Sequence, residues 1–236
     1  LGFKVAEAAD VSTLLDGIDL TKVGINLDCC PGKAVEVAKA LVEYIKAKGA
    51  TEAFRGSIAF NPLRKALRHG APLCDCVVSK AVALIEAVKD IPTLRVIDVD
   101  SAMFCNAGAF IYEELGYALA WGAQWMTALT EAGVSVDEAA RRIKFDMGVS
   151  SNFFMEIAKF RAGRMLWADI VKQYKPADEA AAKMMVHAST SRYNQTIFDA
   201  HVNLLRSQTE TMSAAVAGVD SITVTPFDAP YKKPDA

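Results

Sequence analysis

Short runs of strand-forming residues alternate with longer segments of helical periodicity along most of this chain, and no other feature constrains its fold as strongly. Such regular alternation predicts parallel strands whose faces are covered by helices, because a connection between parallel strands has to cross over the sheet. Two large α/β architectures satisfy the pattern, a doubly wound open sheet and an eight-stranded barrel. The six strand candidates are residues 24–28, 54–60, 94–99, 143–148, 183–188 and 221–225.

Apolar residues recur at helical spacing between these runs. Ser135 and Glu138 fit a capping box that opens a short helix just before the fourth strand candidate. Residues 1–8 are a candidate for a seventh strand. The longer predicted helices cover approximately residues 31–49, 76–88, 107–132, 152–174 and 202–217.

The composition and charge of the chain argue against several classes of binding partner and location. The 236 residues carry a net charge of −2 without a block of like charges, which argues against nucleic acid or an anionic membrane surface as a partner. The longest apolar stretches, residues 81–88 and 212–219, are far shorter than the ~20 residues that span a bilayer. Five cysteines, an odd number in a chain this large, predict reduced thiols in a cytoplasmic protein.

Few residues at the predicted strand ends can carry chemistry. His187 lies on a strand candidate and is either a functional histidine or a core histidine that bonds a backbone carbonyl. Arg142 could hold a phosphate or solvate a helix end. No metal site is expected, because neither Cys29-Cys30 nor Cys74-x-Cys76 has the spacing of a zinc ribbon. The common dinucleotide, phosphate-loop, serine-hydrolase and zinc-protease motifs are absent from the sequence.

Residues 152–169, NFFMEIAKFRAGRMLWAD, resemble a helix in the barrel domain of the adenosylcobalamin-dependent methylmalonyl-CoA mutase family. Further blocks at residues 15–23, 106–122, 186–196 and 219–228 resemble the same family in the same order. The resemblance implies an N-terminally truncated (β/α)8 TIM-type barrel with six or seven strands in this chain. It also implies that residues 1–236 form one partial barrel domain and that the family's C-terminal cobalamin-binding domain is absent.

The resemblance implies that most catalytic positions of the family have changed. Met103 stands where catalytic chains have the histidine that binds the substrate carbonyl, and Asn106 replaces a glutamate that faces the corrin ring. Ala59 replaces a glutamine that contacts substrate, and His69 stands at the arginine that pairs with the substrate carboxylate. No catalytic, cofactor-binding or metal-binding residue is therefore expected. Three further replacements, at a tyrosine, a glutamine and a second glutamate, are Ala102, Ser189 and Ala229.

Three positions match the family's substrate contacts and predict a vestigial CoA-binding site. Ser57 replaces a threonine conservatively, Arg142 matches an arginine that approaches CoA, and His187 is retained. This combination is typical of the family's small noncatalytic subunit, which supports the catalytic chain. The alternative is a catalytic acyl-CoA mutase chain whose acyl specificity has changed.

The resemblance also implies a cofactor and partners. Adenosylcobalamin belongs to the holoenzyme, but we expect none to bind this chain alone, because the family's D-x-H-x-x-G motif has only a near match. In that match, Asp199 is better explained as a helix N-cap, and Leu204 occupies the glycine position after His201. The expected partner is the large catalytic mutase subunit, and a CoA ester is a further candidate ligand. We expect the missing barrel segment to be another chain or to be replaced by self-association.

Overall fold

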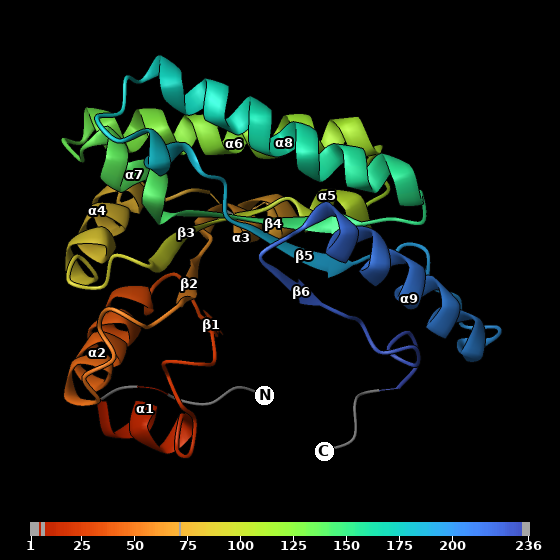
Figure 1. Cartoon of the computed structure of the whole chain (residues 1–236), viewed down its shortest axis with the longest axis horizontal. Helices are drawn as coiled ribbons and strands as arrows, with labels where there is room; N and C mark the ends of the chain where they lie inside the picture. The colour runs from red at the N-terminus through yellow and green to blue at the C-terminus, as the bar shows by residue number, and fades with distance from the viewer. Residues whose placement is uncertain (1–4, 6–7, 71, 233–236) are drawn as a thin grey trace. The chain divides into compact units, whose positions relative to one another are not determined.

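The computed structural model describes residue 5, residues 8–70 and residues 72–232 (Figure 1). The chain divides into two compact units, residues 1–98 with 125–143 and residues 99–124 with 144–236. No helix in the described ranges is long and apolar enough to cross a membrane.

The first unit contains three parallel strands covered by helices, β1 (Ile25–Asp28), β2 (Gly56–Phe60) and most of β3 (Leu94–Asp100). Asn26 pairs with Ser57, which pairs with Arg95. Helix α2 (Ala34–Ala47) packs against both α1 (Ala8–Leu14) and α4 (Val77–Ala87). Gly56 allows β1 and β2 to approach each other, because a Cβ there would lie 2.0 Å from the carbonyl oxygen of Ile25. This unit also contains α3 (Pro62–His69) and α7 (Val136–Arg142).

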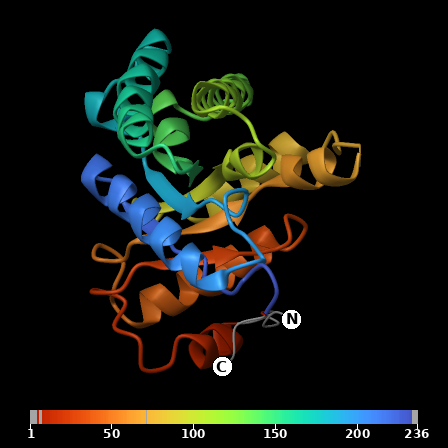
Figure 2. The same ribbon diagram turned by 90° about the vertical axis from the view of Figure 1, so that its right-hand side faces the viewer.

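The second unit contains the parallel strands β4, β5 and β6, and helix α8 packs against α9 (Figure 2, α8 in teal and α9 in blue). Helix α6 (Ile111–Glu131), which has residues in both units, approaches β4 closely at Gly122. A Cβ at Gly122 would lie 2.7 Å from the rings of both Phe145 and Trp167. The remaining elements are α5 (Ala102–Asn106), β4 (Ile143–Val149), α8 (Phe153–Gln173), the 3₁₀ helix η1 (Glu179–Ala182), β5 (Val186–Thr190), α9 (Ala200–Ala217) and β6 (Ser221–Thr223).

The strands follow one another in sequence order from β1 to β6, and this order decides between the two architectures. A doubly wound sheet reverses its strand order at a switch point, whereas a (β/α) barrel keeps the sequence order. The fold is therefore α/β of the barrel type, and the predicted alternation of strands and helices is confirmed. A complete barrel of this type has eight strands, of which the described residues supply six.

Local elements differ from the sequence predictions at several points. The fifth strand begins at Val186 and not at Lys183, because Asp178 caps the 3₁₀ helix η1 just before it. Helix α3 was not predicted, although Asn61 caps it and Pro62 opens it. The candidate strand at residues 1–8 lies mostly outside the described residues, and Ala8 begins helix α1.

The cysteines also differ from the prediction of five reduced thiols. Cys74 and Cys76 form a disulfide, while Cys29, Cys30 and Cys105 are free.

Candidate functional site

One face of the strands β4, β5 and β6 is polar, and we take it as the candidate site. Side chains alternate between the two faces of a strand. Phe145, Met147 and Val186 lie on the opposite face and are fully buried. The polar face contains Lys144, Asp146, His187, Ser189, Ser221 and Thr223.

His187 is held between two hydroxyl groups of the neighbouring strand. Its Nδ1 lies 2.7 Å from Oγ of Ser221, and its Nε2 lies 3.0 Å from Oγ1 of Thr223. Burial and, to a smaller extent, the charge of Lys144 together lower the pKa of His187 to about 4. The imidazole is therefore neutral near pH 7 and donates to one hydroxyl while accepting from the other.

Hydroxyl groups also fix Asp146, in the middle of the polar face. Oγ of Ser189 donates a hydrogen bond of 3.0 Å to Oδ1 of Asp146, and Oγ of Ser101 donates to the Asp146 backbone carbonyl at 3.1 Å. Ser189 stands where the resemblance implies a glutamine. Its short side chain bonds within the sheet, so it does not reproduce the reach of a glutamine.

The last residue of helix α5, Asn106, is joined to the loop that follows β5. Oδ1 of Asn106 accepts a hydrogen bond of 2.7 Å from the backbone N–H of Arg192. Gly108 has φ +93°, and a Cβ there would lie 3.1 Å from the ring of Tyr193. Asn106, where the resemblance implies a corrin-facing glutamate, thus connects the end of α5 to this loop.

Met103 lies in the short helix α5, where the resemblance implies the family's carbonyl-binding histidine. It is half-buried, and its neighbour Ala102 is buried. A thioether sulfur is a weak hydrogen-bond acceptor and has no proton to donate. The position therefore cannot supply the hydrogen bond that the histidine supplies in a catalytic chain.

Sequence reasoning missed a fully buried ion cluster at the carboxyl end of β4. Nζ of Lys159 lies 2.6 Å from carboxylate oxygens of both Glu114 and Glu156 and donates to the Gly148 carbonyl at 2.7 Å. Glu114 also accepts a hydrogen bond of 2.6 Å from the Gly148 N–H. Burial alone would lower the pKa of Lys159, but the two carboxylates outweigh it and raise that pKa. The sequence did contain a sign of this cluster, because Glu156 and Lys159 lie one helical turn apart between apolar residues.

The two predicted CoA contacts of the first unit bond within the unit itself. The buried Arg142 guanidinium donates to the carbonyls of Ile91 and Leu94 and to Glu138, each at 2.7 Å. Oγ of Ser57 donates to Oδ1 of Asn26 at 2.6 Å. These bonds give Arg142 and Ser57 structural roles, and their contact with CoA stays a prediction.

A cavity of about 170 Å3 lies near the carboxyl ends of β1 and β2. Ala59, where the resemblance implies the family's substrate-contacting glutamine, lines this cavity. Arg64 and Arg68 of α3 also line it, and Nη1 of Arg64 lies 3.1 Å from Asp28. His69 is the last residue of α3. Among the described residues, no group of three or more His, Cys, Asp or Glu is placed to hold a metal ion.

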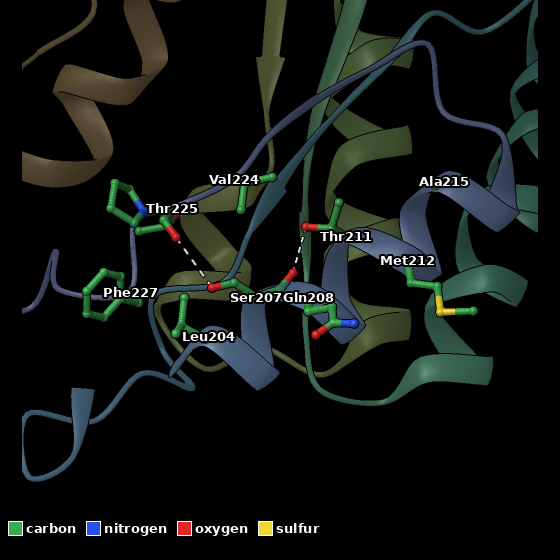
Figure 3. Close-up of a pocket in the computed structure, with 10 residues that line it drawn as sticks. Leu204, Ser207, Gln208, Thr211, Met212, Ala215, Val224, Thr225 and Phe227 are labelled. Carbon is green, nitrogen blue, oxygen red and sulfur yellow. Dashed lines mark hydrogen bonds between the residues drawn. The ribbon is translucent and has the colours of Figure 1, made fainter. Parts of the chain in front are cut away.

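An apolar groove of about 600 Å3 runs between α9 and the segment that follows β6 (Figure 3). Inside it, Oγ1 of Thr211 donates to the Ser207 carbonyl, and Oγ of Ser207 donates to the Thr225 carbonyl. The lining that the structure describes contains no ionisable side chain, so the groove suits an apolar surface better than a reaction. Its lining residues are Leu204, Ser207, Gln208, Thr211, Met212, Ala215, Val224, Thr225, Pro226 and Phe227.

Comparison with known proteins places this geometry in context. Residues 1–236 match the sequence profile of the family described as Methylmalonyl-CoA mutase. The chain is 48% identical over 95% of its length to the methylmalonyl-CoA mutase small subunit of Porphyromonas gingivalis and 34% identical over 94% of its length to that of Streptomyces virginiae. It is 29% identical over 96% of its length to the human mitochondrial methylmalonyl-CoA mutase. The chain spans only 37%, 36% and 31% of these three relatives.

Replacement of Lys159 by Met should destabilise the chain by about 3–5 kcal/mol, because it leaves two buried carboxylates without their cation. Lys172→Met is the matched control, since Lys172 lies on the same helix and its side chain is 61% exposed beside Asp169. That change should alter the free energy of unfolding by less than ~1 kcal/mol. Urea unfolding at pH 7 measures both, and equal effects would contradict the role given to Lys159.

His187 should make stability depend on pH. The unfolded chain binds a proton near the ordinary pKa of 6.5, whereas folded His187 stays neutral down to about pH 4. The contribution of His187 to the free energy of unfolding is therefore complete above about pH 6.5 and is lost as the pH falls from 6.5 to 4. Because the imidazole is only partly buried, solvent screening reduces this contribution to about 1 kcal/mol.

Urea unfolding of His187→Gln and of the unmodified chain at pH 7.5 and pH 4.5 measures this contribution. The unmodified chain should lose more stability on acidification than His187→Gln does. His201→Gln serves as the control, because the His201 side chain is 84% exposed. A pH dependence that His187→Gln leaves unchanged would show that His187 is not the group responsible.

Proposed function

Because this chain belongs to the methylmalonyl-CoA mutase family, we propose that it forms part of a small noncatalytic mutase subunit that supports a large catalytic subunit. The main observation is that Met103 cannot donate a hydrogen bond at the position of the carbonyl-binding histidine. Preorganised hydrogen-bond donors and charges at the reacting atoms supply much of an enzyme's rate enhancement. A polar face without these groups fits a supporting subunit.

Similarity to the named relatives favours the same proposal. The two small subunits are 48% and 34% identical to this chain, whereas the human mutase and a mycobacterial large subunit are 29% identical. The alternative is a catalytic acyl-CoA mutase chain with a changed acyl pocket. Asn106 argues against it, because the resemblance places this residue toward the corrin and not toward the acyl group. A change of acyl specificity would not require that replacement.

The family depends on cobalamin, which supplies radical chemistry when it is bound. The residues of this chain do not fit a cobalt ligand set. His201 lies in the first turn of α9 with its ring stacked on Phe227, and Asp199 caps that helix by accepting a hydrogen bond from the His201 N–H. Leu204, at the position of the motif's glycine, lines the apolar groove. We therefore propose that adenosylcobalamin binds elsewhere in the holoenzyme.

The groove between α9 and β6 supports a further part of the proposal. Helix α9 buries polar residues such as Asn203 and Glu210 while its apolar residues Leu205 and Met212 are more than half exposed. This is the reverse of the usual amphipathic arrangement. The chain spans only 37% and 36% of the two small-subunit relatives. We propose that other residues of the same subunit cover the groove.

The test is complex formation between the full-length subunit that contains this chain and the large subunit from the same organism. We expect the mixture to elute from a sizing column as one species whose mass, measured by light scattering, equals the sum of one copy of each. Each subunit run alone provides the control. Two species that elute independently at micromolar concentration would contradict the proposed partnership.

A further inference from the structure

Three of the five cysteines line one cavity of the first unit, whose volume is about 320 Å3. Cys74 and Cys76 are joined as a disulfide there, and Cys30 is free and exposed. Lys80 is the one charged residue in the described lining, which is otherwise dominated by apolar side chains such as Phe60 and Leu73. None of these cysteines has a part in the mutase proposal.

The disulfide lies at the start of helix α4. Cys76 is the N-cap residue, and its backbone N–H donates a hydrogen bond of 3.1 Å to Sγ of Cys74, while the Val77 N–H is bonded to the Cys74 carbonyl. Lys80 adds a positive charge along the same cavity. Cys74 is the more exposed of the two residues, so an incoming thiolate reaches its sulfur more easily. This exposure favours attack at Cys74 with Cys76 as the leaving group.

Burial makes two of the free cysteines, Cys29 and Cys105, poor nucleophiles. Burial raises the pKa of Cys29 to about 11, and the charges of Asp28 and Cys30 act in the same direction. Burial raises the pKa of Cys105 to about 12, with a further contribution from Glu114. Both thiols are protonated near pH 7, and only thiolates attack disulfides. Cys30 is thus the free thiol that both reaches this cavity and is exposed to solvent.

We propose that this cavity is a thiol–disulfide exchange site for low-molecular-weight thiols and disulfides of the glutathione class. A thiolate RS⁻ forms a bond to Sγ of Cys74 while the Cys74–Cys76 bond breaks, and the electron pair leaves on Cys76 as its thiolate. The Cys30 thiolate then attacks Sγ of Cys74, which forms a Cys30–Cys74 disulfide and releases RS⁻. The thiol is regenerated, so this transfer of the disulfide needs no further oxidant or reductant.

This inference does not depend on the proposed subunit role.

The experiment uses Cys76→Ser, which removes the leaving group and frees Cys74. Glutathione disulfide is added, the free thiols are alkylated, and the peptides are mapped by mass spectrometry. Glutathione should first be transferred to Cys74 and then be displaced by Cys30, so that most molecules contain a Cys30–Cys74 link. Cys30→Ser/Cys76→Ser should instead retain glutathione on Cys74. Cys29→Ser/Cys76→Ser is the matched control and should behave like Cys76→Ser.

Failure of Cys74 to react, or glutathione retained on Cys74 of Cys76→Ser beside a free Cys30 thiol, would overturn the proposal. A second measurement keeps the unmodified protein in the test. After incubation with reduced glutathione, its map should contain the Cys30–Cys74 link and an alkylated Cys76. A map with the Cys74–Cys76 link alone would also overturn the proposal.

Discussion

The second unit depends on one buried cation. Lys159 joins α8 to α6 through Glu114 and to the end of β4 through the Gly148 carbonyl, and all three groups lie away from water. The free-energy cost of removing these charges from water is offset only while every partner is in place. Glu156 completes the cluster by pairing with Lys159 and accepting hydrogen bonds from the N–H and hydroxyl of Ser150. The carboxyl end of β4 is therefore fixed by charge as well as by packing.

The polar face of β4, β5 and β6, which this ion cluster helps to fix, offers few side chains that could react with a substrate. Barrel enzymes place their reacting groups at the carboxyl ends of the strands. In this chain, Asn106 connects the end of α5 to the loop after β5, Ser189 bonds Asp146, and Met103 has no proton to donate. Packing and buried charge maintain the strands that carry this face, and neither requires reacting groups at the strand ends. Fold and chemistry are thus separable here, as expected when function depends on side chains placed on a shared scaffold.

Sequence periodicity predicted the strands and long helices because their burial pattern is local. The N-cap role of Asp199 was also predictable, since it needs only a side chain and the next turn of backbone. The start of β5 was missed because Ala180 to Ala182 follow a capping Asp178 and enter a 3₁₀ turn.

Other features depend on contacts between distant segments, which periodicity does not record. The hydroxyl partners of His187 come from β6, 34 and 36 residues along the chain. A backbone carbonyl was the partner expected for a core histidine at this position, and the structure gives two side chains instead. The Cys74–Cys76 disulfide was missed because an odd cysteine count in a large chain favours free thiols. The Lys159 cluster was missed because Glu114 lies 45 residues before Lys159 in the sequence, although both residues lie on predicted helices.

The most direct measurement is the conversion of methylmalonyl-CoA to succinyl-CoA by the full-length subunit that contains this chain, with adenosylcobalamin present. We expect no product above background from this subunit alone and turnover when the large subunit is added. Within the complex, Met103→Ala should leave turnover unchanged to within about twofold, because this position donates nothing to the reaction. Turnover by the isolated subunit, or its loss in the Met103→Ala complex when assembly is intact, would contradict a noncatalytic role.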